Sequence, residues 1–148
     1  MKIAIACDHG GFELKNAIID KISANNEVKD FGCYSEESVD YIDYAKAVAE
    51  AVAKGDFDKG ILVCGTGIGM SIAANKVKGI RAACCSEAFS AEMTRRHNDS
   101  NILCLGGRVV SIEKGIELAQ LYLSTEFEGG RHERRVGKIT ALEEEYFK

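Results

Sequence analysis

Short, uninterrupted apolar runs alternate with longer segments of helical periodicity along the whole chain. The apolar runs occupy residues 2–8, 28–32, 60–64, 80–85 and 102–107, and the run at 28–32 is the weakest. Strands that bury both faces are apolar throughout rather than alternating, so these runs predict the strands of a parallel sheet covered by helices.

The segments between the apolar runs have the spacing of amphipathic helices. In the first of them, Phe12, Leu14, Ala17, Ile18 and Ile22 fall on one side of a helix. The repeat of strand and helix therefore predicts an α/β sandwich with about five parallel strands. The expected helices cover residues 11–24, 41–54, 68–76, 88–96 and 112–124.

The C-terminal segment, residues 129–148, is much more polar than the rest of the chain. Val136, Ile139, Leu142 and Tyr146 recur there at helical spacing, which predicts a last helix over about 130–147. Its apolar stripe is too narrow for a deep core position. The pattern leaves two alternatives open, a solvated helix and a helix packed against a second subunit.

The composition is that of one ordinary globular domain over residues 1–148. Hydrophobic residues make up 46% of the chain, and the formal net charge of −4 gives no basic field that would attract nucleic acid. The apolar runs are far shorter than the roughly 20 residues of a membrane helix. The start, MKIAIACDHGG, lacks the length and cleavage site of a signal peptide, so we expect a cytoplasmic protein.

Most of the six cysteines are expected to be small buried hydrophobic residues in a reducing compartment. They form no C-x-x-C pair, and with only three histidines they show no zinc-ligand spacing. Cys64 is the exception, because a glycine-rich segment follows it directly. The others are Cys7, Cys33, Cys84, Cys85 and Cys104.

The glycine-rich loop GTGIG, residues 65–69, joins a predicted strand to a predicted helix. It is not a P-loop, because no lysine follows at the required spacing. A dinucleotide fingerprint fails at Met70, although Glu87 stands where a ribose-binding acid would be. Two further interpretations remain, a plain tight turn and an anion hole of converging backbone N–H groups beside a helix N-terminus.

The anion-hole interpretation gives Cys64 a chemical role. At the carboxyl end of a strand and beside a helix N-terminus, a thiolate is favoured and can take a proton from a bound substrate. The neighbouring N–H groups would then hold the oxyanion that develops. A base next to an anion hole fits proton transfer beside a carbonyl group.

Two further polar pairs are candidates for the same site. Asp8 and His9 follow the first strand and should face the same crevice as Cys64, although Asp8 can equally cap the next helix. His97 and Asn98 end a crossover helix, which places them at the opposite edge of the sheet. His97 therefore either serves as a helix-end cation or contributes to the site of another subunit.

Arginines near the start of the last helix are candidate phosphate ligands. Arg131 and Arg135 are four residues apart and share one helix face, the arrangement of a phosphate clamp. An exposed basic patch that also includes Arg134 and pairs with nearby glutamates is the alternative. Arg108, after the fifth predicted strand, is a further candidate.

Six segments, taken in order, resemble one known family. They are IACDHGGFELK, GILVCGTGIGMSIAANK, RAA, RRHND, NILCLGGRVV and GGRHERRVGKI. Together they resemble the family of ribose-5-phosphate isomerase B, which also holds galactose-6-phosphate and allose-6-phosphate isomerases. The resemblance covers essentially the whole chain. It implies a Rossmann-like α/β/α subunit in a homodimer or tetramer, with the last helix as an arm near or across the dimer interface.

The resemblance also implies a reaction. It is the interconversion of D-ribose 5-phosphate and D-ribulose 5-phosphate, a step of the pentose phosphate pathway, through a cis-enediolate and without a metal or cofactor. Allose 6-phosphate or another six-carbon sugar is the alternative substrate, and a non-catalytic phosphosugar-binding protein is the alternative of a different class. Some members carry a glutamate base where Met70 stands, so this chain resembles the cysteine branch.

Residue by residue, the resemblance assigns roles to the candidates above. Cys64 matches the base that moves a proton between C2 and C1 of the sugar. Asp8 matches the residue that contacts substrate hydroxyls or the ring oxygen. His97, together with Thr66, matches the group that opens the furanose ring. The enediolate oxygen is implied to bind at Gly65, Gly67, Ile68 and Gly69. The sugar end and the phosphate are implied to bind at Asn98, His9, Arg108, Arg131 and Arg135.

Overall fold

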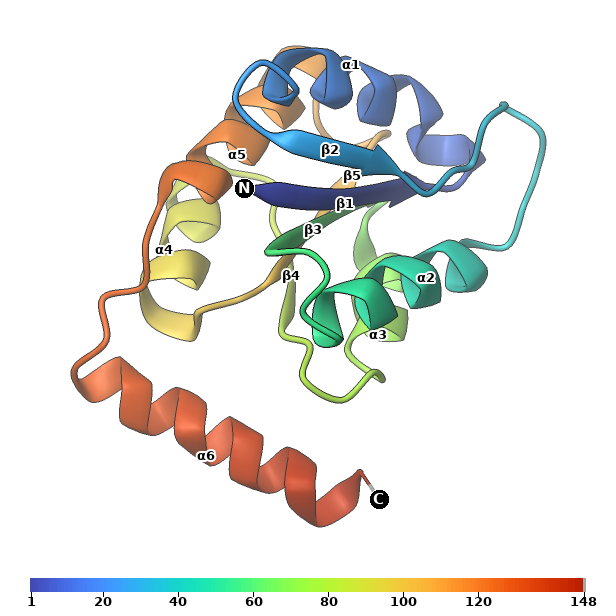
Figure 1. The fold of residues 1–148 in the computed structure, drawn as a ribbon. Coiled ribbons are helices and arrows are strands. Elements are labelled where there is room, and N and C mark those ends of the chain that lie inside the picture. Colours follow the sequence, from blue (N-terminus) through green and yellow to red (C-terminus); the bar gives the residue numbers. More distant parts are fainter. Residues whose placement is uncertain (148) are drawn as a thin grey trace.

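The computed structural model describes residues 1–147 and contains one five-stranded parallel sheet in the order β2-β1-β3-β5-β4 (Figure 1). The strands are β1 (Lys2–Cys7), β2 (Glu27–Asp30), β3 (Lys59–Cys64), β4 (Ala82–Cys84) and β5 (Ile102–Gly106). The helices are α1 (Phe12–Ile22), α2 (Tyr41–Ala53), α3 (Ile68–Ala74), α4 (Ala88–Asn98), α5 (Ile112–Ser124) and α6 (Arg131–Tyr146), and a 3₁₀ turn covers His9–Gly11. The predicted α/β/α architecture is confirmed.

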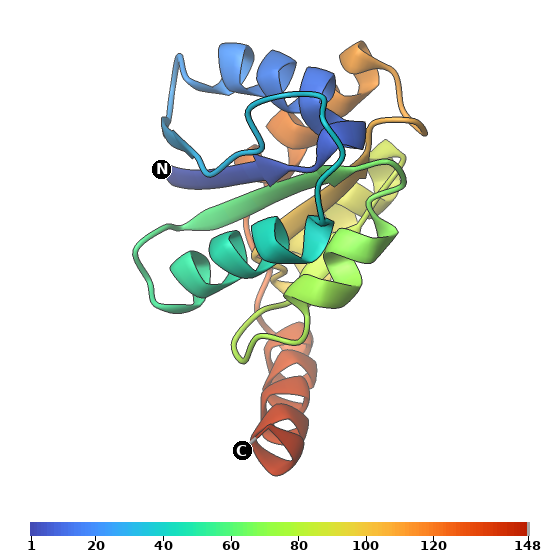
Figure 2. The same cartoon turned by 90° about the vertical axis from the view of Figure 1, so that its right-hand side faces the viewer.

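Helices cover both faces of the sheet (Figures 1 and 2). Alternate side chains of a strand point to opposite faces, so Ile3 and Ile5 of β1 pack toward α1 and α5, whereas Ala4 and Ala6 pack toward α2. The three central strands are buried on both faces, which explains why their sequences are apolar without alternation.

The edge strand β4 is shorter than the apolar run 80–85 that predicts it. Only Ala82 to Cys84 pair with β5. At the outer edge, the backbone groups of Ala82 bond to a side chain instead of a further strand. The Asn75 side-chain amide accepts from the Ala82 N–H (2.8 Å) and donates to the Ala82 carbonyl (3.0 Å). This side chain blocks further strand pairing at the edge.

The topology fixes where a ligand can bind. From β1 the chain passes to β2 on one side and then to β3 on the other, so the connections after β1 and β3 leave a crevice at the carboxyl ends of these two strands. Asp8 follows β1 and Cys64 ends β3. Both candidates therefore lie at this switch point.

Helix α6 extends away from the sheet and packs against α4 (Figures 1 and 2). Near its far end it touches the turn after α3, where Lys78 pairs with Glu144 at 2.9 Å and the Gly79 N–H donates to Glu143 at 2.9 Å. Its apolar residues Leu142 and Tyr146 stay 57% and 71% exposed. The predicted last helix is present, and its apolar stripe has no deep partner within the described chain. None of the helices in residues 1–147 is long and apolar enough to span a bilayer.

Candidate active site

Three loops at the carboxyl ends of β1, β3 and β5 are held together by backbone hydrogen bonds. The Gly107 N–H donates to the Cys64 carbonyl (2.8 Å), the Arg108 N–H to the Gly65 carbonyl (2.9 Å) and the Asp8 N–H to the Val63 carbonyl (3.1 Å). These bonds extend the ladder of the sheet beyond the strands. They hold the backbones of Asp8, Cys64 and Arg108 next to one another at the carboxyl ends of the strands.

The Cys64 thiol lies at the base of the glycine-rich loop. The residue is 5% exposed, and its sulfur accepts the Gly67 N–H at 3.1 Å. Gly67 has φ +81°, and a Cβ there would lie 2.8 Å from the Leu105 carbonyl carbon, so the loop requires glycine at this position. An N–H donated to sulfur stabilises negative charge on it.

Burial raises the pKa of four of the other thiols. Burial raises the pKa of Cys7 to about 12 and that of Cys85 to about 11, and it also raises the pKa of Cys104 and Cys84. These thiols stay protonated at neutral pH. Cys84 is exposed and lies beneath the loop, with its sulfur 3.6 Å from the Thr66 carbonyl oxygen. The sequence prediction that most cysteines act as small hydrophobic residues agrees with this burial.

The mouth of the loop is open to solvent. Thr66 and Ile68 are exposed, and the Thr66 hydroxyl accepts the Ile68 N–H at 3.2 Å. Arg108 reaches over the loop, since a Cβ on Gly65 would lie 3.2 Å from Nη1 of Arg108. A ligand at this mouth would meet the loop amides and a guanidinium group together.

Asp8 and His9 lie at the same edge of the sheet, directly after β1. Asp8 Oδ1 accepts the Gly10 N–H at 2.8 Å and caps the 3₁₀ turn, so the capping role left open by the sequence is present. His9 Nδ1 accepts the Val39 N–H at 3.3 Å. A neutral imidazole with Nδ1 as acceptor carries its proton on Nε2, which makes Nε2 a donor for an anionic ligand.

Glu87, the residue that would bind the ribose of a dinucleotide, has a different role in the structure. The Glu87 carboxylate accepts the Ser90 N–H through both oxygens, at 3.2 and 3.1 Å, and so serves as the N-cap of α4. The hydrogen bonds to Ser90 also lower its pKa. With Met70 buried in place of the third glycine, the loop lacks both features of that fingerprint.

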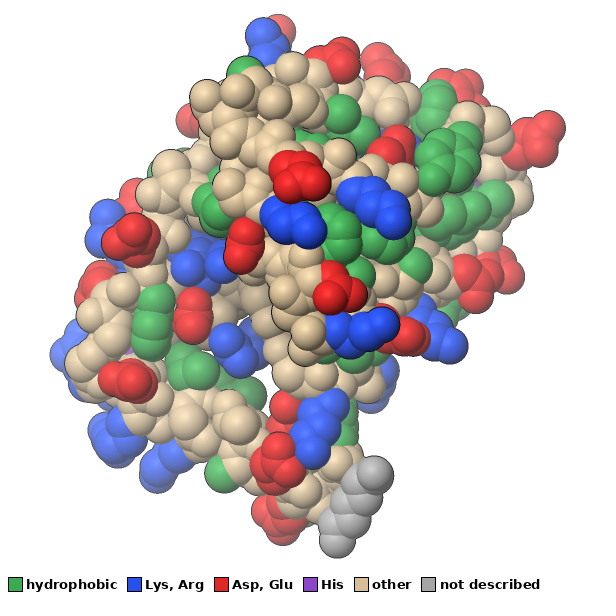
Figure 3. Space-filling view, in the orientation of Figure 1, with side chains coloured by type: hydrophobic (Ala, Val, Ile, Leu, Met, Phe, Trp, Pro, Cys, Tyr) green, Lys and Arg blue, Asp and Glu red, His purple; other side chains and the backbone are tan. Residues whose placement is uncertain are grey.

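The other candidates form a second group at the opposite edge of the sheet. His97 and Asn98 occupy the last turn of α4, and the Asn98 carbonyl accepts from Nε of Arg81 (3.1 Å), which directly precedes β4. The end of α4 therefore lies at the amino ends of the strands. Arg131 and Arg135 are exposed one turn apart at the start of α6. Basic side chains gather over this region in Figure 3.

Two further residues belong to this second group and were not identified from the sequence. The His132 ring stacks on the His97 ring with centroids 4.0 Å apart and planes 12° apart. Glu128 lies 3.8 Å from Nε2 of each histidine. The side-chain donor atoms of the three residues lie within 4.8 Å of one another, but nearly parallel rings do not aim their lone pairs at a common point, as metal ligation requires. The only sequence signal was that His132 stands between the candidate arginines.

Comparison with known proteins accounts for this combination of fold and residues. The family model "Ribose/Galactose Isomerase" matches residues 3–139. The chain is 51% identical over 144 residues to ribose-5-phosphate isomerase B of Escherichia coli (strain K12), covering 97% of each chain.

Two solved structures are similar over almost the full length. The ribose-5-phosphate isomerase B of Clostridium thermocellum gives a TM-score of 0.96 at 53% identity, covering 99% of each chain. The Mycoplasma genitalium ribose-5-phosphate isomerase B with bound ribulose-5-phosphate gives 0.93 at 43% identity, covering 97% of each chain. The chain therefore belongs to the ribose/galactose isomerase family.

Proposed function

We propose that the protein is an aldose–ketose isomerase that interconverts D-ribose 5-phosphate and D-ribulose 5-phosphate through a cis-enediolate. The observation that carries the proposal is the Cys64 thiol at the carboxyl end of β3, with the Gly67 N–H directed at its sulfur at 3.1 Å. The names of the E. coli and M. genitalium relatives, and the ribulose-5-phosphate bound to the latter, support the choice of substrate.

In this proposal Cys64 is the base of the proton transfer. As a thiolate it removes the C2 proton of the open-chain aldose and then delivers a proton to C1. The O2 hydroxyl proton passes to O1 in the course of the reaction, so that C1 gains its hydroxyl and C2 becomes the ketone. The enediolate oxygen that carries the negative charge would be held by backbone amides of the loop at Gly65 and Gly69. The amides of Gly67 and Ile68 would join them by turning from the Cys64 sulfur and the Thr66 hydroxyl toward the substrate. The environment of the sulfur supports this role, because it accepts the Gly67 N–H at the start of α3.

The residues around the crevice would bind the rest of the sugar. Asp8 would accept substrate hydroxyls with the carboxylate that also caps the 3₁₀ turn. His9 would donate through Nε2 to the phosphate, and Arg108 would add a guanidinium group beside the loop. Thr66 at the open mouth would assist the ring-opening step.

We propose that a second copy of the chain completes each site. His97 would open the furanose ring, Asn98 would hold the sugar end, and Arg131 and Arg135 would bind the phosphate, all from a partner subunit arranged head to tail. The separation of these residues from Cys64, at opposite edges of one sheet, supports a site shared between subunits in a homodimer, or in a tetramer of such dimers.

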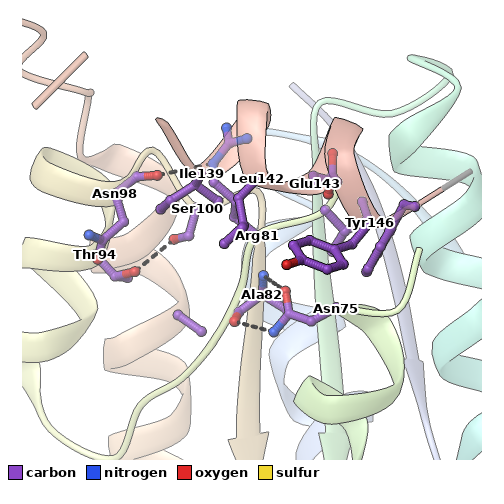
Figure 4. A pocket seen from close by; sticks show the side chains of 13 residues that line it. Asn75, Arg81, Ala82, Thr94, Asn98, Ser100, Ile139, Leu142, Glu143 and Tyr146 are labelled. Atoms are coloured by element: carbon purple, nitrogen blue, oxygen red, sulfur yellow. Dashed lines mark hydrogen bonds between the residues drawn. The ribbon is translucent and has the colours of Figure 1, made fainter. Parts of the chain in front are cut away.

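Exposed apolar residues support the same arrangement. Ile68 and Ile72 of α3 are 55% and 59% exposed beside the loop mouth. At the opposite edge of the sheet, α6 encloses an open groove of about 630 Å³ with the end of α4 and the start of β4. Leu142 and Tyr146 line this groove from α6, and Asn98 and Arg81 line it from the other wall (Figure 4). Apolar surface of this kind is typical of an interface between subunits. The last helix would then serve as an inter-subunit arm.

The single domain of residues 1–148 is proposed to function in the cytoplasm. Its six cysteines are all free, including Cys7 and Cys33, whose sulfur atoms are 3.7 Å apart without a bond. Free thiols at such a distance fit a reducing compartment.

The test of the proposal is turnover of ribose 5-phosphate in the presence of EDTA, compared with allose 6-phosphate. Turnover of the five-carbon sugar supports the proposal, and turnover of only the six-carbon sugar keeps the chemistry and changes the substrate. Cys64→Ala should abolish turnover and leave phosphate binding intact, because the phosphate ligands are other residues. A wild-type protein that binds both sugar phosphates and converts neither would be a phosphosugar-binding protein instead.

A further inference from the structure

The Glu128 carboxylate is held against His97 by the backbone. Glu128 lies in the connection between α5 and α6, and its N–H donates to the Arg96 carbonyl in the last turn of α4 at 3.1 Å. This bond ties the connection to the helix that carries His97. It places one carboxylate oxygen 3.8 Å from Nε2 of His97 and the other 3.8 Å from Nε2 of His132.

The His97 ring is also fixed from one face. His132 is only 6% exposed and stacks on it at 4.0 Å, whereas the His97 side chain stays 37% exposed. The His132 N–H donates to the Gly129 carbonyl at 3.1 Å, which anchors the first turn of α6 beside Glu128. The imidazole of His97 thus has one face covered, one edge beside a carboxylate, and the rest open to a ligand.

The charges around His97 come from three elements. On α4 its neighbours are Arg95, paired with Asp99, and Arg96, paired with Glu92. On α6, Arg131 and Arg135 add positive charge beside the buried His132. Glu128 is the carboxylate within ion-pair distance of the two histidines.

Two stacked imidazoles beside several arginines cannot readily both be protonated. Burial lowers the pKa of His132, the charges of His97 and Arg131 lower it further, and Glu128 opposes these effects. A proton on the buried His132 is therefore disfavoured in the folded chain. The Glu128 carboxylate lies within ion-pair distance of a charge on the His97 ring.

We propose that Glu128 is a positioning residue that orients the His97 imidazole and stabilises its protonated form for the opening of the furanose ring. The inference rests on the proposed function of His97. In the step, the His97 imidazolium gives a proton to the ring oxygen O4 while the C1–O4 bond breaks, and the O1 hydroxyl loses its proton to water, which leaves the C1 aldehyde. Neutral His97 then takes a proton back from solvent, so the net proton count is unchanged.

The two sugars allow ring opening to be measured apart from proton transfer. Ribose 5-phosphate is mainly a furanose ring and must open before the enediolate can form. Ribulose 5-phosphate cannot close a furanose ring, because its C5 oxygen is esterified by phosphate. Exchange of the C1 hydrogen of ribulose 5-phosphate with deuterium from solvent therefore requires Cys64 but no ring opening.

The experiment compares Glu128→Gln with wild type in both assays. We expect turnover of ribose 5-phosphate to fall about ten-fold, less than the full 10²–10⁴ of a general acid, while deuterium exchange stays within two-fold. The pH optimum of turnover should move to lower pH, because the imidazolium has lost its counter-charge. Glu128→Asp should recover part of the rate. Glu126→Gln is the matched control, since it removes the same charge from an exposed side chain two residues away.

Two outcomes would overturn the inference. Unchanged turnover and an unchanged pH profile in Glu128→Gln would show that the carboxylate does not act on His97. Equal losses in turnover and exchange would show a structural defect of the whole site. His97→Ala in the same two assays tests the underlying function separately: loss of turnover with retained exchange supports ring opening by His97, and retained turnover contradicts it whatever Glu128 does.

Discussion

Gly67→Ala is the substitution that the geometry of the loop most clearly forbids. Gly67 adopts φ +81°, and it is the residue whose N–H is directed at the Cys64 sulfur. A Cβ at this position would lie 2.8 Å from the Leu105 carbonyl carbon and 3.0 Å from the Cys84 sulfur. The loop must therefore shift, and the N–H must move away from Cys64.

The size of the effect follows from these contacts. A left-handed backbone costs a non-glycine residue about 1–2 kcal/mol, and crowding against fixed atoms adds about 1–3 kcal/mol. The free energy of unfolding should therefore fall by about 2–5 kcal/mol. Loss of one hydrogen bond to a charged group is worth about 1.5–3 kcal/mol, which predicts a fall in kcat of about ten- to hundred-fold.

Gly55→Ala is the matched control. Gly55 has φ +85° and no atom within 4 Å of an added Cβ. The substitution should therefore lower the free energy of unfolding only through backbone strain, by about 1–2 kcal/mol, and leave the site unchanged. Urea unfolding and ribose 5-phosphate turnover of both variants separate the two effects. Equal loss of stability in the two variants, with kcat of Gly67→Ala within two-fold of wild type, would refute the reasoning about the loop.

Two further predictions concern stability. Lys15→Met should lower the free energy of unfolding by about 3 kcal/mol in urea, because the buried Lys15 ammonium contacts Asp30 (2.9 Å) and the Cys33 carbonyl (2.6 Å); an unchanged midpoint would contradict this. His132 has a pKa lowered from 6.5 by burial, so the unfolded chain binds its proton more readily. The stability that neutral His132 confers is present above pH 6.5 and lost as the pH falls below it. Unfolding at pH 7.5 and 5.5 should show this loss, and His132→Gln should reduce it; an equal loss in the variant would exclude His132 as its source.

The sequence predicted the central part of the fold because burial on both faces leaves a strong pattern. The continuous apolar runs of β1, β3 and β5 specify parallel strands under helices, and the βα order then places Asp8 and Cys64 at one edge. The same topology correctly placed His97 at the other edge. The edge strand β4 was predicted too long, because only Ala82 to Cys84 pair with β5.

The contacts of His132 and Glu128 could not be predicted in this way. They arise where the connection after α5 folds back onto the end of α4, about thirty residues earlier in the chain, and no periodic pattern encodes that meeting. Lys15 is a similar case. It lies in a helical segment where a lysine is expected at the surface, yet it is fully buried because Asp30 and the Cys33 carbonyl lie within its reach.

We propose that Cys64 of one chain and His97 of another act on one sugar phosphate. The most direct measurement mixes equal amounts of Cys64→Ala and His97→Ala proteins, lets the subunits exchange, and follows turnover of ribose 5-phosphate. Half of randomly mixed dimers would contain one chain of each kind, and each of these would have one intact site of two. About one quarter of the wild-type activity should therefore be recovered. A mixture that stays inactive although mass spectrometry shows mixed dimers would contradict the shared site.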